Sequence, residues 1–349
     1  MLLLLLILSL ALGQLGRLEI FPGIVIYVHD LLVILLLISY LPKTKTFSTP
    51  LTRPILAFTL TAIVSLLVAA WHFPPFQVLT GSLYLLRWLA YASVYLVVRQ
   101  LKLPRSNLRF LTLTGLAVAI TGLIQYFVIP DTRFLYDLGW DEHYYRLIGT
   151  FLDPNFTGIF LVLTLLLLWP SPLSLLPFAA LLLTYSRSSY LAFVVVLIAA
   201  LWRHHIRLLF VSCILFLVIL FLLPRPGGEG VKLERLYSLT NRLDSMTTGL
   251  NIFQSAPVTG VGFNLLRFHQ ENPVSHSGAG IDNSFIFLLA TTGIPGFLAY
   301  LWLLKKQLET KLIAYRLSLI AILVHSLLNN TLFYAPIMLW FWLLLALDR

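Results

Sequence analysis

Charged side chains are scarce in this chain. Asp, Glu, Lys and Arg together make up 11% of its 349 residues, whereas 59% of the residues are hydrophobic. Soluble domains carry roughly a quarter charged residues, so the composition excludes an ordinary soluble protein. The hydrophobic residues form continuous runs long enough to cross the ~30 Å hydrocarbon core of a bilayer, without the period-two alternation of membrane β-strands. The sequence therefore predicts an all-α polytopic membrane protein.

Cysteine and the common cofactor patterns are also lacking. The single Cys213 cannot form an internal disulfide. The chain contains no G-x-x-x-x-G-K-[ST] loop, which argues against an ATP-driven machine. It contains neither H-E-x-x-H nor paired C-x-x-C spacing, so neither a metal nor another cofactor is expected.

Twelve hydrophobic segments are predicted to span the membrane. Residues 2–15 lack the positively charged start of a signal peptide, so we interpret them as a short first span. One long loop, 224–283, separates the ninth span from the tenth within a single transmembrane domain, 1–349. The predicted spans are approximately 2–15, 23–41, 54–71, 78–98, 110–129, 155–169, a short seventh ending at 184, 190–202, a ninth ending near 223, 284–304, and two within 312–347 that are separated near 329–330.

The distribution of Lys and Arg predicts the orientation of the chain. Its net charge is +10, and with the N-terminus inside, every dense Lys/Arg cluster falls on the same side of the predicted spans. Because cytoplasmic loops are enriched in Lys and Arg, both termini are predicted to be cytoplasmic and the 224–283 loop external. The basic residues are spread over short loops, which argues against a nucleic-acid partner.

The external loop contains a predicted amphipathic helix. Apolar residues recur at three- and four-residue spacing between 231 and 255, and Arg235 and Arg242 share one face. This basic face contacts either solvent and lipid headgroups or a lipid-linked phosphate. Arg187 lies between two short hydrophobic runs. It either snorkels to the interface or grips a phosphate or carboxylate with its planar fork.

Four further titratable residues are candidates for chemistry. Asp282 directly precedes the tenth span, where it is predicted to cap the helix and is also available for catalysis. His276 in the loop could be a general base near neutral pH. Asp30 and Arg87 lie inside predicted spans and are expected to pair with each other, either as a structural ion pair or as a substrate contact.

Four short motifs follow one another in the second part of the chain. They are G-T-F-L-D-P-N at 149–155, T-Y-S-R-S at 184–188, Arg242 followed by P-V-T-G-V-G at 257–262, and D-N-x9-G-I-P-G at 282–296. In this order and topology the chain resembles the O-antigen ligase and O-antigen polymerase superfamily of bacterial membrane glycosyltransferases. The corresponding family motifs are G-x-F-x-x-P-N, T-x-S-R-[GS], P-x-x-G-x-G and H-[NSQ]-x9-G-x-x-G, so Asp replaces the family His in the fourth.

The resemblance implies a transfer reaction on the outer face of the bacterial inner membrane, without metal or nucleotide. It implies a donor glycan on undecaprenyl diphosphate and an acceptor sugar hydroxyl. The acceptor is the core of lipopolysaccharide for a ligase and another glycan chain for a polymerase. Arg187 and Arg242, assisted by Arg235, are then expected to stabilise the diphosphate leaving group. The further candidates for binding the substrate are Asn155, Asn283 and Arg87.

The replacement of the family His by Asp282 affects which residue is expected to act as the base. In the family, the His is proposed to activate the acceptor hydroxyl. The pKa of a carboxyl group starts near ~3.9, and nearby arginines are expected to lower it further, which makes Asp282 the weaker base. Asp282 could still orient the hydroxyl, or His276 could supply the base. In the family that the chain resembles, Asp-Asn at this point is more typical of polymerase-like members, so the resemblance favours a polymerase over a ligase.

Two other function classes would use the same features. A flippase or other transporter of lipid-linked glycans would bind the same diphosphate through the same arginines, although the sequence shows no convincing internal repeat. A non-catalytic scaffold in an envelope complex would not require the Arg and Asp cluster. The sequence therefore favours a glycosyltransferase, with a lipid-linked glycan transporter as the alternative.

Overall fold

The computed structural model describes residues 1–21, 23–44, 48–101, 103–203, 205–269, 280–310 and 312–347. Over these residues the chain is mostly helical, with one two-stranded antiparallel sheet. The α-helices are α1 Leu2–Ser9, α2 Val28–Tyr40, α3 Thr52–Ala69, α4 Pro75–Gln100, α5 Leu108–Val128, α6 Pro154–Leu168, α7 Leu175–Leu183, α8 Arg187–Leu201, α9 Ile206–Leu222, α10 Tyr237–Ser255, α11 Ser284–Leu308, α12 Ile313–His325 and α13 Ala335–Leu347. The strands are β1 Arg17–Phe21 and β2 Ile24–Tyr27. The short 3-10 helices are η1 Leu10–Gly16, η2 Leu41–Lys43, η3 Arg105–Asn107, η4 Arg133–Leu138, η5 Gly149–Phe151, η6 Pro172–Ser174, η7 Glu229–Val231, η8 Leu266–Phe268 and η9 Thr331–Phe333.

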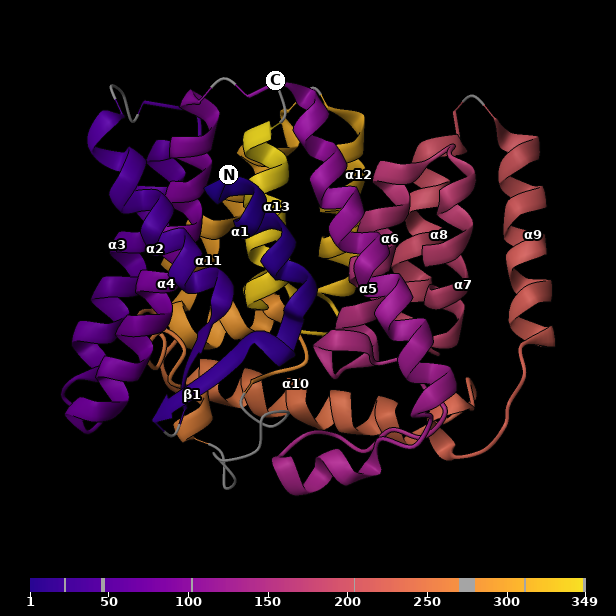
Figure 1. The fold of residues 1–349 in the computed structure, drawn as a ribbon. Coiled ribbons are helices and arrows are strands. Elements are labelled where there is room, and N and C mark those ends of the chain that lie inside the picture. The colour runs from indigo at the N-terminus through magenta and orange to yellow at the C-terminus, as the bar shows by residue number, and fades with distance from the viewer. Residues whose placement is uncertain are drawn as a thin grey trace.

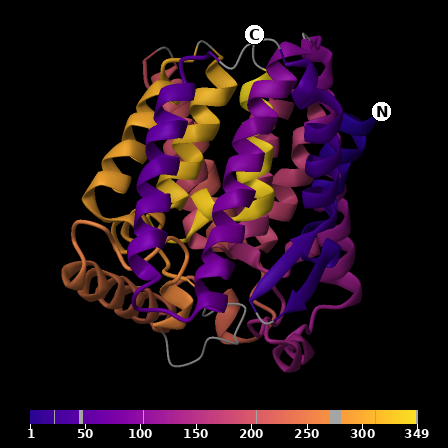
Figure 2. The same cartoon turned by 90° about the vertical axis from the view of Figure 1, so that its left-hand side faces the viewer.

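The apolar helices run side by side, and α10 lies across one end of the bundle (Figure 1). Figure 2 shows from the side that α10 lies below the ends of the neighbouring helices. The N- and C-termini lie away from that end. The amphipathic helix predicted in the long loop is thus confirmed as α10, and it packs mainly on α11.

Four of the described helices, α3, α4, α5 and α11, are long and apolar enough to cross a membrane, judged by length and composition. The remaining apolar helices are shorter, so the count of twelve spans and the external position of the 224–283 loop stay predictions. The predicted second span is wrong at its start, since residues 24–27 form β2. The β-branched Ile24, Val25 and Ile26 favour a strand, which pairs with β1.

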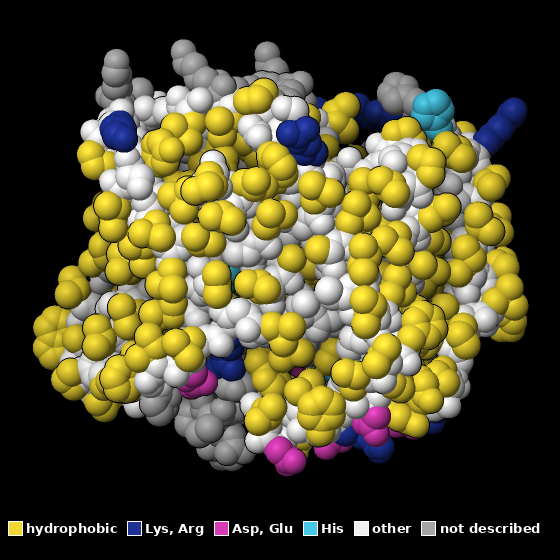
Figure 3. Space-filling model, in the orientation of Figure 1, with side chains coloured by type: hydrophobic (Ala, Val, Ile, Leu, Met, Phe, Trp, Pro, Cys, Tyr) yellow, Lys and Arg dark blue, Asp and Glu magenta, His cyan; other side chains and the backbone are white. Residues whose placement is uncertain are grey.

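The outside of the bundle is apolar over most of its height (Figure 3). Asp and Glu side chains are visible on this face only toward the end where α10 lies. Helix α9 exposes apolar side chains such as Phe210, Leu217 and Phe221 along its length. In contrast, every residue of α13 is buried in the bundle. An apolar surface of this kind is what a helix bundle presents to lipid.

Helix α11 is interrupted at Gly293, whose φ of +65° is not helical. The turn 257–262 docks into this break, where the backbone N–H of Val261 donates to the carbonyl oxygen of Ala290 (2.9 Å). A Cβ atom on Gly293 would lie 2.2 Å from the carbonyl oxygen of Val258. The two glycine motifs therefore form one joint, which fixes the segment after α10 against α11.

Candidate active site

A cleft of about 640 Å³ lies at the end of the bundle that α10 crosses. Its walls come from the β1–β2 hairpin, α4, the 140–156 segment, the start of α10 and the segments around 263–268, 280–287 and 329–338. The predicted site residues that line it are Arg87, Asn155, Arg235, Arg242 and Asp282. Arg187 and Asn283 are not among the lining residues, and His276 lies outside the described part of the chain.

Two helices begin beside the cleft with polar caps. The carboxylate of Asp153 accepts hydrogen bonds from two backbone N–H groups at the start of α6 (2.6 and 3.0 Å). The side chain of Asn283 does the same at the start of α11 (2.8 and 3.0 Å). The prediction that Asp282 caps this helix is wrong, because the chain enters the helix one residue later. The carboxylate of Asp282 therefore lines the cleft instead of capping the helix.

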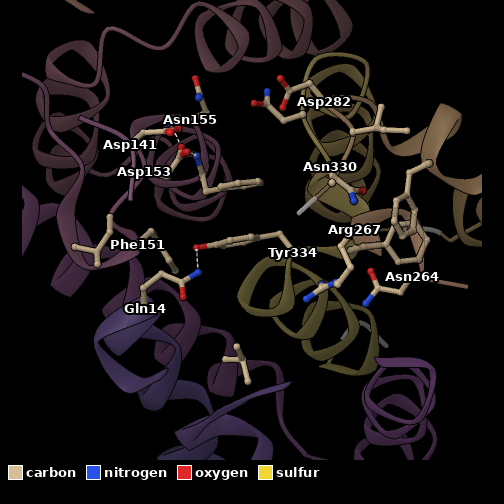
Figure 4. A pocket seen from close by; sticks show the side chains of 18 of the residues that line it. Gln14, Asp141, Phe151, Asp153, Asn155, Asn264, Arg267, Asp282, Asn330 and Tyr334 are labelled. Carbon is tan, nitrogen blue, oxygen red and sulfur yellow. Dashed lines mark hydrogen bonds between the residues drawn. The ribbon is translucent and has the colours of Figure 1, made fainter. Parts of the chain in front are cut away.

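Asp141, Asp153 and Asp282 line the same cleft (Figure 4). Burial raises the pKa of Asp153 to about 6, and the negative charge of Asp141 adds to this increase. Burial also raises the pKa of Asp282, even though Arg242 acts in the opposite direction. The expected net lowering of the pKa of Asp282 is therefore wrong, because the desolvation of its charged form outweighs the attraction of Arg242.

Positively charged side chains line the cleft, namely those of Arg146, Arg235 and Arg242. Burial, together with the charges of Arg187 and Arg242, lowers the pKa of Arg235 to about 10. Burial and the charge of Arg235 lower the pKa of Arg146 to about 9. Over the described ranges, Arg146, Arg235 and Arg242 form no ion pair with a carboxylate. An anion in the cleft would therefore be attracted by several positive charges.

These arginines differ in how many hydrogen bonds their guanidinium groups already donate to protein atoms. Arg235 donates to the carbonyl oxygens of Gly230 (2.7 Å) and Lys232 (2.8 Å). Among the residues that the structure describes, Arg242 makes one long hydrogen bond, from Nη2 to Oδ1 of Asn329 (3.4 Å). Arg242 therefore keeps most of its donor capacity for a ligand.

Arg187 begins α8 and binds the chain segment that leads into α10. Its Nη1 donates to the carbonyl oxygens of Arg235 (2.8 Å) and Leu233 (3.2 Å). The same guanidinium lies close enough to Arg242 for their charges to interact. Arg187 thus adds positive charge behind the cleft and fixes the backbone at Arg235.

The predicted pairing of Asp30 with Arg87 is confirmed. Arg87 Nη2 lies 2.8 Å from Asp30 Oδ2, and the Tyr91 hydroxyl donates to Asp30 Oδ1 (2.5 Å). The Arg87 guanidinium also lies over the ring of Tyr84, at 5.0 Å from its centroid. Because Asp30 already balances its charge, Arg87 contributes less free positive charge to the cleft than Arg242 does.

A buried polar network lies behind the cleft. His325 Nε2 lies within hydrogen-bond distance of Ser188 Oγ (3.1 Å) and Ser189 Oγ (3.3 Å), and its Nδ1 lies 2.6 Å from Thr331 Oγ1. Asn155 Oδ1 accepts from Ser186 Oγ (2.9 Å) in the same cluster. The serines of the 184–189 segment therefore bind protein groups and hold α6, α8 and α12 together.

Sequence reasoning missed Asp141, Asp153 and Arg146 as site residues. A signal was available, because the polar segment between the predicted fifth and sixth spans is rich in Asp, Tyr and Arg, and Asp153 lies inside the 149–155 motif. Asn329 was noted only as a break between the last two spans. Its contact with Arg242 joins segments far apart in the chain, which no local pattern reveals.

Residues 172–301 match the protein family described as O-antigen ligase. Over this stretch the chain is similar to the O-antigen ligase family. The resemblance inferred from the motifs is therefore confirmed, whereas no curated protein matches the chain. The match supports a multi-pass membrane protein of the O-antigen ligase type with a glycosyltransferase-like activity.

The matched stretch runs from η6 into α11 and contains Arg187, Arg235, Arg242 and Asp282. The 149–155 motif precedes it. The cleft joins this stretch to the N-terminal hairpin and to the last helices, so the site is assembled from the whole chain.

Proposed function

We propose that the protein is a membrane-embedded glycosyltransferase that moves a glycan from undecaprenyl diphosphate to an acceptor sugar hydroxyl. The observation that carries this proposal is that Arg242 and Arg235 line the same cleft as the partly buried carboxylate of Asp282, all within the stretch that matches the O-antigen ligase family. The cations can stabilise the negative charge of the leaving diphosphate, and the carboxylate can accept a hydrogen bond or a proton from the attacking hydroxyl. The bond from the donor sugar to the diphosphate breaks, the acceptor oxygen forms the new glycosidic bond, and the acceptor proton is lost.

The arginines act on the leaving group. Arg242 binds the diphosphate with its unoccupied donors, assisted by Arg235, while Arg187 adds charge from behind and holds the Arg235 backbone in place. Preorganised cations in a cleft with little water stabilise the negative charge that develops as the bond breaks. The polyprenyl chain of the donor would lie in the surrounding bilayer. Asn155 and Arg87 line the cleft and contact the glycan in this proposal, whereas Asn283 caps α11 and supports the wall from outside the cleft.

Asp282 accepts the proton of the acceptor hydroxyl or orients it. Burial raises the pKa of its carboxyl group, which makes it a better base than an ordinary exposed aspartate. His276 remains the alternative base. The active site faces outward, both termini are cytoplasmic, and no metal or nucleotide takes part in this proposal.

The test uses purified protein in lipid nanodiscs, an undecaprenyl-diphosphate oligosaccharide and candidate acceptors, without nucleotide or added metal. The measured product is free undecaprenyl diphosphate. Acceptor-dependent release is expected from the unaltered protein. Arg242→Ala should reduce its rate by about 10²–10³, and the matched control Arg207→Ala, an exposed residue at the start of α9, should leave it unchanged.

The acceptor that supports release distinguishes a ligase, which uses the core of lipopolysaccharide, from a polymerase, which uses a second lipid-linked glycan. Activity that survives in Asp282→Ala and is lost in His276→Ala would move the base to His276. Absence of release with every acceptor, together with movement of the lipid across the bilayer, would replace the transferase by a transporter.

A further inference from the structure

We propose that the cleft contains a sugar-binding subsite built from Asn264, Arg267 and Asn330, separate from the arginines that face the diphosphate. The inference rests on the proposed function and extends it, because it states where a sugar ring of the glycan lies. These three side chains belong to no motif of the sequence. They lie together on the side of the cleft opposite Asp141 and Asp153 (Figure 4).

The protein holds these side chains in place from two directions. Asn264 and Arg267 follow the turn that docks into the α11 break, and Asn330 directly precedes η9. Arg267 Nη1 donates to the carbonyl oxygen of Gly23 (3.1 Å), and the guanidinium lies 4.7 Å from the centroid of the Tyr84 ring. A side chain fixed in this way is preorganised to bind a ligand with its remaining donors.

Each of the three side chains leaves a buried polar atom without a partner. Asn264 Nδ2, Arg267 Nε and Asn330 Oδ1 are buried and make no hydrogen bond within the part of the chain that is described. Buried polar groups are almost always paired, so three such atoms in one wall of a cleft indicate a missing ligand. Asn264 also has a φ of +60°, a left-handed conformation that costs free energy in a residue other than glycine.

The mixture of donors and acceptors points to hydroxyl groups. A phosphate only accepts hydrogen bonds, so it would leave Asn330 Oδ1 unpaired. A hydroxyl group both donates and accepts, and neighbouring hydroxyls on one ring can satisfy the two amides and the guanidinium together. The chemistry of this wall therefore fits a sugar better than it fits the diphosphate.

Aromatic rings complete the subsite. Trp88, Phe263 and Phe268 also line the cleft, and Phe263 and Phe268 are the chain neighbours of Asn264 and Arg267. The ring of Phe263 packs against that of Phe333 at 5.9 Å between centroids. A sugar ring has apolar C–H faces and a polar hydroxyl edge. Flat aromatic walls beside a few fixed polar groups suit such a ligand.

The subsite adjoins the proposed reaction centre. Asn329 accepts the hydrogen bond of Arg242, and the next residue, Asn330, lines the subsite. Gly280 and Ile281 connect the same wall to Asp282. A sugar held there would therefore lie beside both the diphosphate-binding arginine and the candidate base.

The experiment measures equilibrium binding to the full-length protein in nanodiscs. The three probes are undecaprenyl diphosphate without a glycan, the same lipid carrying an oligosaccharide, and the lipid-free core oligosaccharide of lipopolysaccharide. The variants are Asn264→Gly, which keeps the left-handed backbone accessible, Arg267→Lys and Asn330→Ala. The matched control is Asn251→Ala, on an exposed part of α10 outside the cleft.

Each variant is expected to weaken the binding of one glycan-bearing probe about tenfold, as expected for a lost buried hydrogen bond, and to leave the bare lipid unchanged. A change with the lipid-linked oligosaccharide assigns the subsite to the donor sugar, and a change with the core oligosaccharide assigns it to the acceptor. Equal weakening of all three probes, or no change with either glycan, would overturn the subsite. Glycan binding without any release of undecaprenyl diphosphate would instead overturn the transferase and leave the subsite standing.

Discussion

At the scale of single residues, the environment of Asp282 determines what it can do. A general base acts only in its unprotonated form, and burial raises the pKa of Asp282. The transfer rate is therefore expected to rise with pH through a pKa above that of an ordinary carboxyl group. Asp282→Asn should lower the rate by about 10²–10⁴, and Asp282→His should move the acid limb of the pH–rate profile toward the ~6.5 of histidine. An unchanged profile in Asp282→His would contradict this role.

Asp153 gives a second prediction at this scale, for stability. Its pKa of about 6 in the folded protein exceeds the ordinary 3.8, so the folded state holds the proton more tightly than the unfolded state. The contribution of protonated Asp153 to the free energy of unfolding is fully present below about pH 4 and is lost as the pH rises through 6. Asp153→Asn, which can still cap α6, should flatten this dependence of the melting temperature between pH 4 and 7. The control is Asp137→Asn at an exposed position, which should leave the pH dependence of the melting temperature unchanged.

At the scale of elements, the joint between the 257–262 turn and α11 holds one wall of the cleft. Gly293→Ala would place a Cβ atom 2.2 Å from the carbonyl oxygen of Val258 in a left-handed backbone. We expect a loss of folding free energy on the order of 2–4 kcal/mol, measured by denaturant titration in detergent. Gly280→Ala is the control, because the nearest described atom to its Cβ would be Nδ2 of Asn330, at 3.7 Å. Equal stability of the two variants would show that the joint is dispensable.

At the scale of the whole molecule, the cleft and the chain termini lie toward different ends of the bundle. The excess of Lys and Arg in the predicted cytoplasmic loops then predicts that the cleft faces outward. In a Cys213→Ser background, Asp137→Cys should react with a membrane-impermeant maleimide on intact spheroplasts. Lys43→Cys, after α2 at the other end, should react only after permeabilisation. The reverse pattern would place the cleft in the cytoplasm.

Local patterns in the sequence predicted the elements well. The apolar runs correspond to helices, and the apolar spacing within 231–255 predicted α10. The prediction that Arg235 shares a helical face with Arg242 is wrong, because α10 begins at Tyr237 and Arg235 precedes it. Two predictions about the ends of these elements were wrong. Residues 24–27 form a strand instead of the start of a helix, and the cap of α11 is Asn283 instead of Asp282.

What the sequence by itself determined is the helical bundle, its amphipathic helix and the similarity of residues 172–301 to the O-antigen ligase family. Long apolar runs must satisfy their backbone hydrogen bonds internally in lipid, and a helix does this within a single segment. Only the tertiary structure decided which side chains meet in the cleft. The contact of Arg242 with Asn329 and the grouping of Asn264 with Asn330 join distant segments. The raised pKa of Asp282 follows from burial by the whole fold, a quantity that depends on every neighbouring segment and on no local pattern.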